Sequence, residues 1–371
     1  MPYLREPIPP GELPESLAPF LSPDAPPARQ LMLARGMAPG LGPQDLLTGL
    51  YQLSLAQDEK LALAAKKTAC ELPDALIEGG IKGQLPPGVL DLLAEILQER
   101  TPLLQRVLLD LRTPDETILV QARTLRDDSL LELIAANEQR MIRHPAIIEA
   151  LYLNPRTRMS TASRVMELAV RNELELGLPA YKEIARALGT ETKYEDQGDK
   201  EWAEAAADAA FDEAIAEGGE DAEAPSIEEL EGEAESELAK KTSLLGLTLS
   251  QKVRLALVGS GYHRALLLRD PNRTVAMAAI KSPKIREAEV VSVTMSRSVN
   301  DDVIRYIANN RDWLKLYQVK VGLVNNPKCP LPTSMRFLPH LRVPDLRTVS
   351  RSRNVPQALR QAAQQMLNRR G

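Results

Sequence analysis

Apolar residues recur at helical spacing over most of the chain. From Arg29 to about Leu188 they form short amphipathic stretches that are interrupted repeatedly by proline or glycine, and the pattern returns from about Leu247 to Leu367. Apolar positions three and four residues apart place one stripe of a helix against a core. The sequence therefore predicts two long stretches of short, packed helices.

Several prolines stand where a helix would begin. Thr113-Pro114-Asp115-Glu116 combines a capping hydroxyl, a proline at the first helical position and a capping-box glutamate. It predicts a helix that begins at Pro114 with Thr113 as its cap. Ser129-Leu-Leu-Glu132 is a second capping box, and Thr101-Pro102 and Gly42-Pro43 predict further helix starts. In these stretches the prolines therefore indicate helix boundaries and not disorder.

The chain contains one pattern twice. Residues 127–137 match residues 301–310 in the spacing of residue types, and residues 151–157, with an Asn-Pro pair, match residues 323–329. The offset is 174 at the first pair of segments and 172 at the second. A nearly constant offset is typical of stacked repeat units. We therefore expect the two copies to superpose.

One segment sets local preference against this pattern. Val290-Val291-Ser-Val293-Thr294 is β-branched and favours a strand. It lies where the duplicated pattern expects a helix, so we predict a helix there.

Three turn motifs carry a resemblance to a known family: Ile307-Ala-Asn-Asn310, Asn326-Pro327-Lys328 and Asp270-Pro271-Asn272-Arg273. With them the chain resembles bacterial HEAT-like solenoids of the leucine-rich-repeat-variant kind, over roughly residues 30–188 and 245–368. The repeat lengths are irregular, and a long acidic insertion interrupts them. The resemblance implies an α-solenoid and a binding or scaffolding role, and it transfers no catalytic residue to this sequence.

The predicted fold class is all-α, an irregular HEAT-like α-solenoid in two related blocks joined by a long acidic linker. Residues 1–28 hold nine prolines before residue 28 and are expected to be an extended or disordered arm. Residues 29–190 form the first repeat block. Residues 191–244 are an acidic linker, expected to be disordered or to contain fraying helix, with docking on a basic surface as the alternative. Residues 245–371 form a basic second block.

The net charge of -5 conceals a strong asymmetry. Residues 191–240 contain 19 acidic residues and 3 lysines, whereas residues 241–371 contain 23 basic and 7 acidic residues. These segments therefore carry -16 and +16. We hypothesise that the acidic linker screens the basic block and competes with an anionic partner, so that deleting residues 195–237 would tighten polyanion binding.

Nine basic residues of the second block are candidate binding residues, because they fall at or near turns that would align along one edge of a solenoid. A positive ridge at helix N-termini would favour anions, although a solvated surface is the alternative interpretation. The nine are Arg269, Arg273, Arg297, Arg311, Lys315, Lys328, Arg336, Arg351 and Arg353.

No motif predicts an enzyme, a metal site or a cofactor. His144, His263 and His340 have no metal-ligand spacing and no neighbouring nucleophile, and a Cys329–His340 pair lacks orienting groups. Two distant cysteines and the absence of a long apolar run favour a cytoplasmic protein without a membrane partner.

The leading hypothesis is a non-enzymatic cytoplasmic scaffold that binds a protein partner through stacked helical repeats. The alternative is binding of nucleic acid or another polyanion by the basic C-terminal block, modulated by the linker. A glycosylase built on HEAT-like helices is a third possibility, but no catalytic carboxylate in an aromatic pocket supports it.

Overall fold

The computed structural model describes residues 3–22, 25–191, 200–218 and 243–370. This part of the chain contains α-helices, short 3-10 helices and connecting turns, and it contains no strand. The predicted all-α class is confirmed. The chain divides into two compact units, Met1–Thr157 and Arg158–Gly371. None of the described helices combines the length and the apolar character needed to cross a bilayer.

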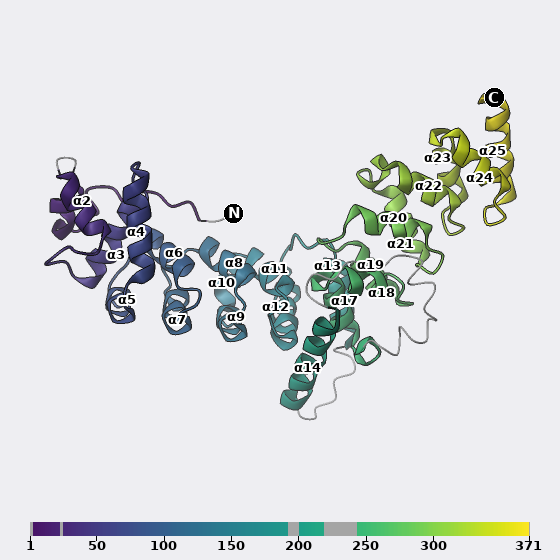
Figure 1. Cartoon of the computed structure of the whole chain (residues 1–371). Helices are drawn as coiled ribbons and strands as arrows, with labels where there is room; N and C mark the ends of the chain where they lie inside the picture. Colours follow the sequence, from purple (N-terminus) through teal and green to yellow (C-terminus); the bar gives the residue numbers. More distant parts are fainter. Residues whose placement is uncertain (1–2, 23–24, 192–199, 219–242, 371) are drawn as a thin grey trace. The chain divides into compact units, whose positions relative to one another are not determined.

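In the first unit, successive helices pack in two rows. Helix α5 packs on α7 and α7 on α9, while α6 packs on α8 and α8 on α11, and contacts between α6 and α7 join the rows (Figure 1). Buried leucines fill the space between them. The helices are α1 (Ala18–Leu21), α2 (Pro27–Ala34), α3 (Pro43–Ser54), α4 (Glu59–Glu71), α5 (Asp74–Ile81), α6 (Pro87–Ile96), α7 (Thr101–Leu109), α8 (Asp115–Thr124), α9 (Asp128–Ala135), α10 (Glu138–Arg143) and α11 (Ala146–Leu153), preceded by the 3-10 helix η1 (Glu15–Leu17).

The second unit is built in the same way from neighbouring helices. Helix α17 packs on α13 and α19, α19 packs on α21, and α20 packs on α22. The elements are α12 (Met159–Arg171), α13 (Tyr181–Glu191), α14 (Lys200–Gly218), η2 (Ser243–Gly246), α17 (Leu249–Val258), α18 (Gly261–Leu267), α19 (Arg273–Ile280), α20 (Glu287–Met295), α21 (Asp301–Asn309), η3 (Trp313–Lys315), α22 (Tyr317–Asn325), α23 (Leu331–Phe337), η4 (Leu338–His340), α24 (Val343–Arg351) and α25 (Gln357–Arg370).

The described units differ from the predicted domains at two places. The first unit ends at Thr157 and not at residue 190, because α13 packs on α17 and α19 of the second unit. Residues 200–218, placed in a linker that was expected to be disordered or to contain solvated, fraying helix, form helix α14, and its Phe211 and Ala214 are buried instead of solvated. Both side chains are buried in the second unit, and this burial offsets the ordering entropy of the helix. The other parts of the predicted linker, 192–199 and 219–242, lie outside the described residues.

The N-terminal arm is also more ordered than its prolines predicted. Residues 3–8 are extended, as expected, but they make side-chain and backbone contacts with α3 and α6. Leu17 is fully buried and Phe20 is nearly so. Of the two predicted alternatives, the described residues 3–8 thus take the extended one, and their backbone groups find partners in the folded unit.

Helix starts were predicted well by proline and less well by the capping boxes. Helix α3 begins at Pro43 and α7 at Thr101, as predicted, whereas α8 begins at Asp115 without a cap from Thr113. The buried Thr113 hydroxyl instead donates to the Val107 carbonyl at 2.5 Å. For α9 the cap is the Asp127 carboxylate and not Ser129, because its oxygen accepts from the first free amides of the helix.

Helix α20 contains the β-branched segment Val290–Thr294, which confirms that the duplicated pattern outweighs strand propensity there. Val290, Val293 and Thr294 are buried. Packing on neighbouring helices therefore decides the conformation of this segment.

Two buried asparagines make the same three hydrogen bonds in the two copies of the duplicated pattern. Asn154 Nδ2 donates to the carbonyls of Ala122 and Leu125, both at 2.9 Å. Asn326 Nδ2 donates to Thr294 and Ser296, at 2.8 and 2.9 Å. Each Oδ1 also accepts from the backbone N–H two residues further on, at 2.9 Å. The Asn-Pro turn thus fastens the end of one helix to the end of an earlier one.

Replacing Asn326 with alanine is expected to destabilise the second unit by about 2 kcal/mol, because two carbonyls of buried residues lose their donor. Urea denaturation followed by circular dichroism measures the change. Asn325→Ala is the matched control, because the Asn325 amide donates within its own helix, to the Val321 carbonyl. Equal stabilities of the two variants would contradict this role for Asn326.

Candidate functional site

A groove lies in the first unit where α7 and α9 end. Its volume is about 520 Å³, and it is lined by Leu109, Leu133, Ala136 and residues 137–139. Leu109 is the last residue of α7, and its side chain is 57% exposed. Two residues further on, Leu111 is 82% exposed. The end of α7 and the turn after it therefore present two leucines to solvent, of which Leu109 lines the groove.

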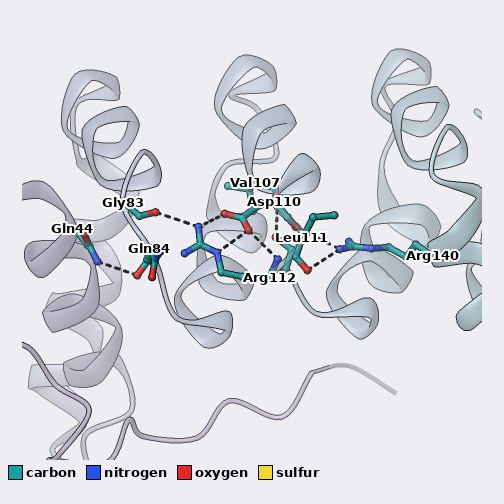
Figure 2. Close-up of polar contacts among 9 residues, drawn as sticks. Gln44, Gly83, Gln84, Val107, Asp110, Leu111, Arg112 and Arg140 are labelled. Atoms are coloured by element: carbon teal, nitrogen blue, oxygen red, sulfur yellow. Dashed lines mark hydrogen bonds and ion pairs between the residues drawn. The ribbon is translucent and has the colours of Figure 1, made fainter.

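The turn that carries Leu111 is held from both sides (Figure 2). The Asp110 carboxylate accepts from the Arg112 backbone N–H at 2.9 Å and from Arg112 Nη2 at 2.6 Å. Arg112 Nη2 also donates to the Gly83 carbonyl of the preceding turn at 3.2 Å. The hydrogen bond from the Arg112 side chain lowers the pKa of Asp110, so the carboxylate stays ionised and continues to accept from Arg112. The turn is therefore pre-organised.

The buried Arg140 fixes the same turn from the groove side. Its Nη2 donates to the carbonyls of Asp110 and Leu111 at 3.4 and 3.3 Å, as Figure 2 shows. Its Nε lies 3.4 Å from the Asp115 carboxylate. Asn137 caps α10 by accepting from the Arg140 backbone N–H at 3.1 Å. Arg140 thus links the turn after α7 to Asp115, while Leu109 and Leu111 stay exposed to solvent.

The same kind of link occurs in the preceding turn, where Gln44 Nε2 donates to the Gln84 carbonyl at 2.9 Å (Figure 2). Side chains of one helix thus hold the turn backbone of another at successive positions along this edge. Two successive turns along this edge, at residues 83–84 and 110–111, are therefore held by side-chain hydrogen bonds to their carbonyls.

Two of the nine predicted binding residues hold the fold itself. Lys328 Nζ donates to the Val299 carbonyl at 2.7 Å. Arg336 Nη2 donates to the Ala308 carbonyl at 3.4 Å, and its guanidinium lies 4.8 Å from the centre of the Phe337 ring. Both side chains satisfy backbone carbonyls of the second unit.

Two further members form ion pairs on the surface. Arg273 lies 2.6 Å from the Asp302 carboxylate, and Lys315 lies 2.7 Å from that of Asp312. Arg269 lies two residues after the end of α18 and is half-buried. Four members are exposed and form no ion pair with a described residue: Arg297, Arg311, Arg351 and Arg353. The structure thus gives different roles to residues that the sequence grouped together.

Two side chains considered for catalysis, those of His263 and Cys329, are buried in the fold. His263 is buried; its Nδ1 accepts from the Ser260 backbone N–H at 3.1 Å, and its Nε2 donates to the Ala214 carbonyl at 2.8 Å. Burial raises the pKa of the Cys329 thiol, which disfavours the nucleophilic thiolate. Among the described residues, no three His, Cys, Asp or Glu side chains are arranged to hold a metal ion.

The groove was not found from the sequence. The available signal was Leu109 and Leu111 on either side of Asp110, an apolar pair at a predicted helix end where polar turn residues are usual. No family model, curated protein or solved structure matches the chain.

Proposed function

We propose that the chain is a non-enzymatic cytoplasmic scaffold whose helices form a HEAT-like α-solenoid and bind a protein partner. The observation that carries the proposal is the groove lined by Leu109, together with the exposed Leu111 two residues further on. The ordered packing of α5, α7 and α9 supports the solenoid assignment, since each repeat then buries its apolar face on its neighbours.

Exposed leucines on a fixed turn favour a protein as the partner. Burying apolar surface contributes roughly 25 cal/mol per Å², and a pre-organised site avoids the entropic cost of ordering on binding. Leu111 is held by hydrogen bonds to its own backbone and to that of its neighbours. A segment that covers Leu109 and Leu111 therefore gains apolar burial at little conformational cost.

The rim of the groove defines the chemistry of that segment. Glu138 is exposed at the start of α10, directly beside the apolar wall formed by Leu109 and Leu133. A partner segment with two apolar side chains and one basic residue complements this arrangement. The apolar residues supply affinity, and the ion pair with Glu138 selects the orientation.

The proposal predicts that Leu111→Asp reduces partner capture at least tenfold without unfolding the chain, since a carboxylate on the exposed turn opposes apolar docking. Full-length wild-type and variant chains would be used to capture proteins from lysate after nuclease treatment, with quantitative mass spectrometry as the readout. Leu63→Asp is the matched control, because Leu63 is 60% exposed on α4, away from the groove residues.

Proteins captured equally by wild type and the Leu63 variant, but lost by the Leu111 variant, support the groove. Equal loss with both variants, or equal capture by all three chains, contradicts it. Circular dichroism of each variant checks that the fold is retained.

Polyanion binding by the second unit is a second candidate function, favoured by the exposed Arg351 and Arg353 at the end of α24. Part of the positive charge of this unit is used internally, as in the buried pair between Arg264 and Glu289. Binding that falls steeply with salt and is weakened in the double variant Arg351→Gln/Arg353→Gln would support this function.

A further inference from the structure

The N-terminal arm lies on the first unit as an extended segment. None of the described residues from Tyr3 to Pro10 is buried, and Leu4 is 76% exposed. Burial in the core begins only at Leu17. Polar contacts and the partial burial of Tyr3 and Ile8 hold residues 3–8 in place, and no side chain of this segment is part of the core, so the segment can leave without opening it.

The backbone of the arm is recognised by two neighbouring residues of α3. The Tyr51 hydroxyl donates to the Glu6 carbonyl at 2.8 Å. The Gln52 amide accepts from the Ile8 N–H at 2.8 Å and donates to the Ile8 carbonyl at 3.3 Å. Proline removes backbone donors and leaves an extended segment without internal hydrogen bonds, so its remaining polar groups are open to such contacts.

The Tyr51 hydroxyl is built into the site. The ring is buried, and burial raises the pKa of Tyr51 to about 12, so the hydroxyl remains a donor at neutral pH. Gly88 of α6 lies against this hydroxyl, and any Cβ at that position would collide with it. A glycine is therefore required where the helices approach each other at the site.

Arg5 is held by carboxylates of α6. Its Nε donates to Asp91 at 2.6 Å, and its Nη2 lies 2.5 Å from Glu95. Nη2 also donates to the Asp91 carbonyl at 3.3 Å. The second carboxylate oxygen of Asp91 accepts from the Thr117 hydroxyl at 2.5 Å, which fixes its orientation. Charge-assisted bonds of this kind are among the strongest hydrogen bonds in proteins.

We propose that Tyr51, Gln52, Asp91 and Glu95 form a recognition site for an extended segment of a partner protein with an arginine two residues before a proline, and that residues 3–8 occupy it in cis. A tyrosine hydroxyl and a side-chain amide read the backbone of a proline-restrained segment, while carboxylates select its arginine. The tethered arm competes at a high effective concentration and sets a threshold for the partner. This site is separate from the groove beside Leu111.

The proposal predicts that Arg5→Ala in the full chain opens the site. The probe is a fluorescent peptide with the sequence of residues 3–12, measured by anisotropy. Its affinity should rise at least tenfold from wild type to the Arg5→Ala chain. Relative to the Arg5→Ala chain, the affinity should fall at least tenfold in the double variant Arg5→Ala/Gln52→Ala. The Arg5→Ala chain should also bind at least tenfold more weakly to a peptide in which alanine replaces the arginine. Leu4→Ala is the matched control in the arm and should bind as weakly as wild type.

Equal affinity of wild-type and Arg5→Ala chains for the peptide would overturn the proposal. So would indifference of the Arg5→Ala chain to the arginine of the peptide. Light scattering adds a separate check: a wild-type dimer that becomes a monomer in Arg5→Ala would show that the site serves a second copy and overturn its assignment to a different partner.

Discussion

Replacing Glu289 with alanine is expected to destabilise the second unit by about 3–5 kcal/mol, because it leaves a buried guanidinium without its counter-charge. Arg264 and Glu289 are both buried, and two hydrogen bonds join them, Nε to Oε2 at 2.9 Å and Nη2 to Oε1 at 2.7 Å. The remaining Nη1 donates to the Gly259 carbonyl at 2.9 Å, so the arginine cannot turn outward without losing that bond as well. Urea denaturation of the full chain measures the loss.

The double variant Arg264→Met/Glu289→Leu separates the unpaired charge from the lost contact. Because apolar residues of similar size often replace a buried ion pair at little cost, the double variant should lose less stability than Glu289→Ala alone. Lys315→Ala, which removes an exposed pair with Asp312, should leave the transition unchanged. A Glu289→Ala chain as stable as wild type would show that the pair contributes nothing to folding.

The second large effect is expected at Phe211, where alanine should cost about 3–5 kcal/mol through lost burial and a residual cavity. Phe211 is fully buried, and the guanidinium of the buried Arg254 lies 4.7 Å from the centre of its ring. Helix α14 is held further by Asp208, which accepts from the Ser160 N–H at 2.8 Å. The variant therefore loses both an apolar anchor and a cation–π contact.

Glu213→Ala is the matched control, because Glu213 is exposed on the same helix. Equal unfolding midpoints for the Phe211 and Glu213 variants would mean that α14 does not stabilise the second unit. A large loss confined to the Phe211 variant also bears on the screening hypothesis. Deleting residues 195–237 would then remove a structural helix along with the acidic charge, so that deletion cannot test screening alone.

Local physical chemistry allowed the sequence to determine the helices and many of their ends. Proline restricts φ and disfavours helical conformation in the preceding residue, so Pro43 at the edge of an apolar periodic stretch marks a helix start. The duplicated Asn-Pro turns were recognisable because the same side chain performs the same task in each copy. The same repetition also led to the correct prediction of a helix at Val290–Thr294, despite the strand propensity of this segment.

Only the tertiary structure decided which charged and extended segments have partners. The composition of residues 191–244 predicted a solvated linker, because carboxylates dominate its average polarity. In the structure, the burial of one residue, Phe211, holds helix α14 in place. The same holds for the arm, where contacts between Arg5 and Asp91 join residues far apart in the chain. Periodicity reports which face of a segment is apolar, but not which distant group will meet its polar atoms. For that reason only the packed helices reveal the groove lined by Leu109 and the residues that bind the arm. The same is true of the structural roles of Lys328 and Arg336.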